Sequence, residues 1–195
     1  MGRGRLEAFS DGVIAILITI MVLELRVPHG DGWDALSERS HEFLAYVLSF
    51  VYLGIYWNNH HHMLHLVERI SGSVLWANLH LLFWLSLVPV GTAWMGAHHD
   101  DPTQAVATYG VILLGSAFAY TLLQTRLVRL LGPSSKLANA VGSDRKGKLS
   151  IACYVAGIAS AFKYPQLAIA LYAGVALIWL VPDRRIERQL PPVAP

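Results

Sequence analysis

A single carboxylate stands directly before an uncharged apolar segment near the amino terminus. Asp11 precedes residues 13–23, none of which carries a charge. A carboxylate at membrane depth is costly unless it is paired, and such residues often mark ion pathways or proton relays. Arg5 and polar residues in the stretches 57–61 and 78–80 are its candidate partners. The alternative is that Asp11 lies at the membrane interface, where the headgroup region hydrates it.

Four histidines crowd one stretch farther along the chain: His60, His61, His62 and His65. The second and fourth are four residues apart, a helical spacing that can hold a metal ion. A membrane enzyme with a histidine-bound metal is therefore one hypothesis. No histidine follows position 99, so a matching second pair is missing, and we predict no metal site. Histidine titrates near neutral pH, so whether these rings sense pH or bind metal stays open.

Composition points to lipid as the surrounding solvent. Of 195 residues, 54% are apolar and 14% are charged, against roughly 25% charged in soluble domains. A net charge of +2 with scattered basic residues argues against nucleic-acid binding. The single Cys153 excludes an intrachain disulfide and a cysteine-based metal cluster. Neither a catalytic triad nor a phosphate-binding loop is present, so we expect no enzyme and no cofactor.

The elements that must position these side chains are membrane-spanning helices, each needing about 20 mostly apolar residues. We predict an all-α integral membrane protein with one domain, residues 1–182, and a basic, then proline-rich cytoplasmic tail, residues 183–195. Pro89 should kink the third span. The six predicted spans are 6–27, 41–66, 71–97, 102–131, 149–162 and 165–181.

The distribution of basic residues sets the orientation of these spans. With both termini in the cytoplasm, only Arg26, Arg39 and Lys163 of the 15 Lys and Arg lie outside. That asymmetry follows the positive-inside rule. We therefore expect a multi-pass protein of the cell membrane with both termini cytoplasmic.

The first predicted helix has two different faces. At about 100° per residue, apolar and small side chains recur at helical spacing along one stripe, while Ser10 and Asp11 fall on the opposite side. The carboxylate therefore does not share a face with the apolar stripe. The stripe comprises Phe9, Gly12, Ile16, Thr19, Ile20, Leu23 and Val27.

Several motifs in the first half of the chain carry a resemblance. Arg5 to Asp11 has the form R-x-x-x-F-S-D, Trp57 to His60 has the form W-x-x-H, and Asn78 and Pro89 follow on the third span. This pattern resembles the opening of the transmembrane protein 175 family of potassium channels. The second half of the chain matches only in its number of spans.

The resemblance implies a homotetramer, because this chain carries one six-helix repeat, and the first helix of each subunit would line a central pore. Ile16 would form the constriction, and Thr19, Ile20 and Leu23 would continue the pore wall. A buried polar network would hold the first helix in place; its residues would be Arg5, Ser10, Asp11, Trp57, His60 and Asn78.

Elementary physics indicates how such a pore would work. A narrow ring of isoleucine side chains loses its water and closes the path, and a slight widening rehydrates it. Potassium sheds water more readily than sodium, and threonine hydroxyls can replace some of that water. We expect a potassium-preferring cation channel with modest selectivity. Besides the histidine-metal enzyme, the alternative is a proton-coupled transporter of ions or small solutes that uses Asp11 and the histidines.

Overall fold

The computed structural model describes residues 2–27, 32–98, 100–142 and 144–180. The described residues form nine helices and no strand. In chain order these are α1 (Arg3–Leu23), α2 (Trp33–Ser37), α3 (Ser40–His65), α4 (Gly72–Ser86), α5 (Val88–Ala97), α6 (Thr103–Leu131), α7 (Lys136–Val141), α8 (Arg145–Ala161) and α9 (Pro165–Leu180). The short helices α2 and α7 have no counterpart among the predicted spans, and the predicted tail lies outside the described residues.

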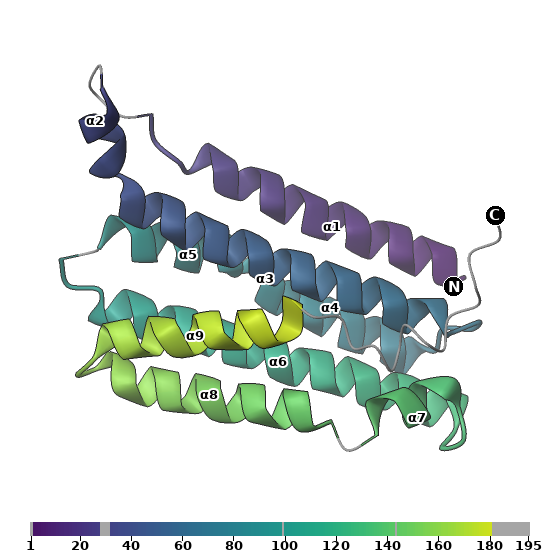
Figure 1. Cartoon of the computed structure of the whole chain (residues 1–195). Helices are drawn as coiled ribbons and strands as arrows, with labels where there is room; N and C mark the ends of the chain where they lie inside the picture. Colours follow the sequence, from purple (N-terminus) through teal and green to yellow (C-terminus); the bar gives the residue numbers. More distant parts are fainter. Residues whose placement is uncertain (1, 28–31, 99, 143, 181–195) are drawn as a thin grey trace.

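The long helices lie side by side in one bundle (Figure 1). Helix α1 runs along one edge of it and packs against α3, α4 and α5. Helix α6 packs against α4, α5 and α8, and α8 packs against α9 at the far side of the bundle. The pore helix expected from the sequence is therefore a peripheral helix of the single chain.

Among the described residues, three helical segments are long and apolar enough to cross a membrane: α1, the joined α4–α5 segment Gly72–Ala97, and α6. Helix α9 is apolar but shorter, with 16 residues. Helix α3 has 26 residues, and polar side chains and histidines interrupt its second half. Three mainly apolar segments therefore pack together with the more polar helix α3.

The largest departures of the observed helix ends from the predicted spans lie in the first, third and fifth spans. Helix α1 ends at Leu23 rather than at residue 27. The predicted span 71–97 is broken at Leu87, because Pro89 has no amide hydrogen for the helical ladder and instead opens α5. Helix α8 begins four residues earlier than predicted, because the carboxylate of Asp144 accepts the amide hydrogen of Gly147 at 3.1 Å and caps the helix.

Two glycines let three helices approach each other around one tyrosine. Tyr172 of α9 is fully buried, and its ring lies against Gly110 of α6 and Gly157 of α8. A Cβ atom at either glycine would collide with that ring. Small residues at such crossings are the usual means of close packing between membrane helices.

We expect Gly157→Ala to destabilise the bundle by about 1–3 kcal/mol, because the added methyl overlaps a buried ring that has no room to move. The melting temperature of the detergent-solubilised protein should fall by several degrees. Gly174→Ala on α9 is the matched control, since a Cβ there meets nothing within 4 Å. Equal melting temperatures for the two variants would contradict this packing.

Candidate ion pathway and its polar anchor

One face of α1 is packed into the protein. Its buried side chains recur every three or four residues, which is the spacing of one side of a helix. They contact the neighbouring helices α3, α4 and α5. These residues are Leu6, Ser10, Ile14, Leu17 and Met21.

The opposite face of α1 is exposed. Ile16 is 57% exposed, Ile20 41% and Leu23 80%, and Thr19 is exposed between them. This is the apolar stripe expected from the sequence, and it turns away from the chain's own core. No charged side chain lies on α1 from residue 12 to residue 23. The exposed face is therefore an uncharged surface with a single hydroxyl, available to another copy of the chain or to lipid.

The hydroxyl of Thr19 is oriented by its own helix. Its Oγ1 donates a hydrogen bond of 2.9 Å to the carbonyl oxygen of Ile16. Because its hydrogen is engaged in that bond, the oxygen presents lone pairs to whatever lies beside the exposed face. Such an oxygen is suited to accepting from water or to contacting a cation.

A chain of buried hydrogen bonds ties the other face of α1 to α4 and α3. The Oγ of Ser10 donates to the carbonyl oxygen of Leu6 at 2.9 Å. Nδ2 of Asn78 on α4 donates to that same Oγ at 2.9 Å, and its Oδ1 lies 2.7 Å from Nε2 of His60 on α3. An amide oxygen can only accept, so Nε2 of His60 carries the proton. All three side chains are fully buried.

The three other residues expected in this network are not bonded to it. Asp11 is half-buried, and its Oδ1 is a buried atom that has no hydrogen-bond partner among the described residues. Arg5 is exposed, and its side chain makes no hydrogen bond or ion pair to another described residue. Trp57 is 45% exposed and stacks on His61. Nδ1 of His60 is likewise buried without a partner within the described ranges.

Comparison with known proteins identifies the group of channels to which this arrangement belongs. Residues 5–89 match the family described as endosomal/lysosomal potassium channel TMEM175. A potassium channel from Chryseobacterium sp. is 57% identical over 190 residues, which cover 97% of this chain and 98% of that protein. The chain belongs to the TMEM175 family. A potassium channel from Streptomyces collinus is a more distant member, 33% identical over 90% of each chain.

A solved structure supports the same assignment. The crystal structure of a lysosomal potassium-selective channel TMEM175 homolog from Chamaesiphon minutus superposes with a TM-score of 0.80 at 27% identity, covering 93% of this chain and 97% of that one. The chain is thus an all-helical, multi-pass membrane protein. The region that matches the TMEM175 family runs from α1 to the start of α5 and contains the whole hydrogen-bonded chain from Ser10 to His60.

The histidines of this TMEM175 chain form polar contacts at one end of α1 and α3. Nδ1 of His61 lies 3.0 Å from Oε1 of Glu7, and Nε of Arg3 lies 3.6 Å from Oε2 of that carboxylate. Arg3 also donates to the carbonyl oxygen of His65 at 3.3 Å. In the described part of the chain, no group of three or more His, Cys, Asp or Glu side chains could hold a metal ion.

Glu7 was not singled out from the sequence. It lies four residues before Asp11, inside the x-x-x part of the R-x-x-x-F-S-D motif, where nothing marks it as a partner for a histidine 54 positions away. A signal was available in its helical position, since residues 3, 7 and 11 recur at steps of four and therefore line one side of α1. The crossing point of α3 was needed to see which histidine Glu7 meets.

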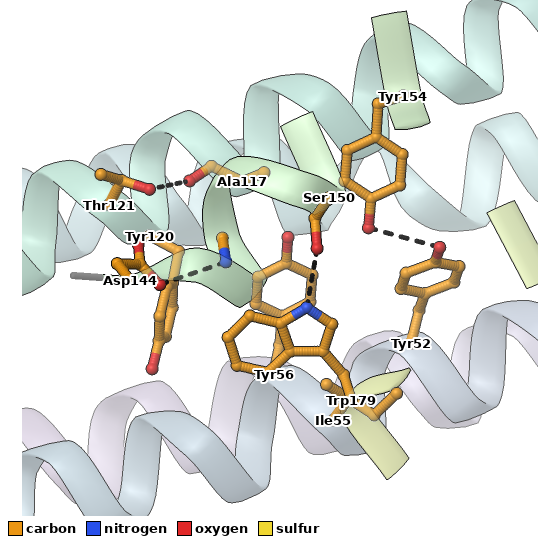
Figure 2. A pocket seen from close by; sticks show the side chains of 11 residues that line it. Tyr52, Ile55, Tyr56, Ala117, Tyr120, Thr121, Asp144, Ser150, Tyr154 and Trp179 are labelled. Atoms are coloured by element: carbon orange, nitrogen blue, oxygen red, sulfur yellow. Dashed lines mark hydrogen bonds between the residues drawn. The ribbon is translucent and has the colours of Figure 1, made fainter. Parts of the chain in front are cut away.

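A small aromatic cavity lies between helices other than α1 (Figure 2). It measures about 40 Å³, and tyrosines of α3, α6 and α8 line it together with Trp179 of α9. The hydroxyl of Tyr154 donates to that of Tyr52 at 3.3 Å, and Nε1 of Trp179 donates to the Oγ of Ser150 at 2.8 Å. No α1 side chain lines it. The cavity is thus separate from the exposed stripe of α1.

Proposed function

We propose that four copies of this chain surround a shared axis and that the exposed face of α1 in each copy lines a potassium pathway. The protein is a potassium channel of the TMEM175 family and not an enzyme. The observation that carries the proposed architecture is the division of α1 into a packed face and an exposed, uncharged face at the edge of the bundle. The exposed face of such a helix can contact a neighbouring copy while the packed face keeps its contacts within its own subunit.

Within that arrangement, Ile16 forms the constriction. It is the first large side chain of the exposed face past Gly12. Because it is 57% exposed, it can contact the Ile16 side chains of the three other subunits. Four branched aliphatic side chains around an axis exclude water when they are close together. Ile20 and Leu23, one and two turns farther on, continue the wall.

Thr19 supplies the polar layer of this pathway. Four hydroxyl oxygens, each holding its hydrogen on the carbonyl of Ile16, would point lone pairs toward a passing cation. Potassium gives up water more readily than sodium, so a short ring of such oxygens favours it modestly.

The proposed membrane arrangement keeps the domain of residues 1–182 with six spans, both termini in the cytoplasm and the tail 183–195 on that side of the cell membrane. The excess of Lys and Arg on the proposed cytoplasmic loops supports this orientation. The Glu7–His61 contacts and the polar chain of Ser10, Asn78 and His60 then lie toward the cytoplasmic end of the pore helix. Arg5, Asp11 and Trp57 are proposed to complete this anchor in the tetramer.

Reconstitution in planar bilayers tests the function directly. We expect discrete unitary currents whose reversal potential follows the potassium gradient, and a detergent-solubilised mass equal to four chains. Saturable flux without unitary currents would instead indicate a carrier. Currents from a protein that is not tetrameric would overturn the proposed architecture and leave the channel activity standing.

Removing the hydroxyl layer should affect selectivity more than conduction. We expect Thr19→Val, which has nearly the same shape, to lower the potassium-to-sodium permeability ratio severalfold while unitary currents persist, because each subunit loses one acceptor oxygen. Thr19→Ser keeps that oxygen and should retain the ratio. Bi-ionic reversal potentials measure both variants. An unchanged ratio in Thr19→Val would assign the discrimination to the isoleucine ring alone.

A further inference from the structure

Four of the six side chains that line a groove between α4 and α6 can donate hydrogen bonds. The groove has a volume of about 300 Å³, and its walls are formed by Ser73, Trp76, Ala77, His80, Leu122 and Arg126. No carboxylate lines it. Two apolar side chains and four side chains that can donate hydrogen bonds therefore share one concave surface.

The guanidinium of Arg126 has no ionic partner in the part of the chain that the structure describes. Arg126 is half-buried on α6, and within the described chain no Asp or Glu lies at ion-pair distance from it. A half-buried cation without a carboxylate is costly on a membrane helix. An external anion would satisfy it, and the planar fork of an arginine matches a phosphate group.

The neighbouring side chains of the groove are also set up to donate. Nε1 of Trp84 donates to Nε2 of His80 at 3.1 Å. Tryptophan can only donate, so the proton of the neutral His80 ring is on Nδ1, which is left as a donor. Trp76 is 75% exposed, and its indole N–H makes no hydrogen bond to any described residue.

Exposed aromatic side chains lie farther along the two helices that form the groove. Helices α4 and α6 run antiparallel, because the start of α4 faces Arg126 whereas Trp84, near the end of α4, packs on Gly115. In that direction each helix exposes a phenylalanine: Phe83 of α4 is 56% exposed and Phe118 of α6 is 52% exposed. The side chains that can donate thus lie toward the start of α4, and the two phenylalanines lie farther along the helices.

We infer that this groove binds an anionic phospholipid, with the phosphate held by Arg126 and the donors beside it and with an acyl chain extending toward Phe83 and Phe118. The match rests on charge complementarity between Arg126, with three neutral donors beside it, and a phosphodiester, and on the depth of the pocket in the membrane. Arg126 lies five residues from the end of α6, about 7–8 Å along the helix. Basic pockets between membrane helices at that depth suit lipid headgroups, and tryptophan favours the same level.

The test compares lipid binding by three forms of the full chain. Native mass spectrometry in detergent gives dissociation constants for phosphatidylglycerol and phosphatidylcholine. We expect the native protein to bind phosphatidylglycerol more tightly than phosphatidylcholine. Arg126→Gln should raise the dissociation constant for phosphatidylglycerol about tenfold, whereas Arg129→Gln should change it by no more than about twofold. Arg129 is the matched control, an exposed arginine on the same helix that does not line the groove. If both variants lose the same affinity for phosphatidylglycerol, the lipid is attracted by the overall positive charge of the helix end, and the proposed site is wrong.

Two further arms separate the possible occupants. Inorganic phosphate at millimolar concentration should leave phosphatidylglycerol bound; complete displacement would reassign the groove to a free anion. In vesicles, brominated phosphatidylglycerol should quench the tryptophan fluorescence of the native protein more than that of the Trp76→Phe variant. Absence of that difference, together with loss of oligomers in Arg126→Gln, would mean that a second copy covers the groove. If Arg126→Gln aggregates, Arg126→Lys replaces it in the binding measurement, and we expect this variant to bind phosphatidylglycerol with intermediate strength. The fluorescence quenching experiment then provides the second test of the site.

Discussion

Ile16→Asn is expected to raise the potassium current and to lower selectivity against sodium. If four isoleucines form a narrow, dry ring, amides of similar size keep the ring hydrated and remove the cost of drying it. A barrier lowered by only about 1.4 kcal/mol raises the current about tenfold. The side chain is 57% exposed, so the substitution should not disturb the packing of the subunit. Single-channel recordings in symmetrical and bi-ionic solutions measure both effects.

The matched control for this prediction is Ile16→Leu, which preserves volume and apolar character. It should keep both the low current and the ion preference. A second variant, Ile20→Asn, asks whether the constriction lies one turn farther along α1. If Ile16→Asn behaves like the native channel while Ile20→Asn opens the pathway, the narrow point has been assigned to the wrong residue, although α1 would still line the pore.

Asn78→Ala should destabilise the protein and loosen α1. The amide of Asn78 bonds to Ser10 through Nδ2 and to His60 through Oδ1, at 2.9 and 2.7 Å. Its removal leaves two buried polar groups without their partner, at a cost of about 2 kcal/mol or more. We expect the melting temperature to fall by several degrees and the proportion of assembled protein in size-exclusion chromatography to decrease.

Asn139→Ala is the control for Asn78→Ala, because Asn139 is an exposed amide on α7. Its effect should stay within about 0.5 kcal/mol. Asn78→Asp tests the hydrogen-bond assignment more closely, since a carboxylate can still accept from His60 but can no longer donate to Ser10. If Asn78→Ala is as stable as the native protein, the chain of hydrogen bonds through Asn78 does not anchor α1.

The predicted network and the observed contacts differ in an informative way. Ser10, His60 and Asn78 are joined, whereas Asp11, although it stands next to Ser10, turns to a different side of α1 and leaves Oδ1 unpartnered among the described atoms. A step of one residue rotates a side chain by about 100° around the helix. Membership of a short motif therefore does not decide which residues of the motif contact each other within one subunit.

The sequence by itself determined that this is a helical membrane protein and which stripe of the first helix is apolar. Both follow from local rules: the scarcity of charge and a recurrence at helical spacing from Phe9 to Leu23. The family likewise could be read from the first half of the chain, because the R-x-x-x-F-S-D and W-x-x-H motifs are each short local patterns.

Tertiary structure alone decided the partners of the polar residues. Ser10 and Asn78 are 68 positions apart, and Glu7 and His61 are 54 apart, so their pairing depends on where α1 crosses α4 and α3. The donor groove has the same origin, since Ser73 and Arg126 belong to helices that meet only in the folded bundle. Helical periodicity is set within a few residues, but the point at which two helices cross is set by side-chain packing along their whole length, which no local pattern contains.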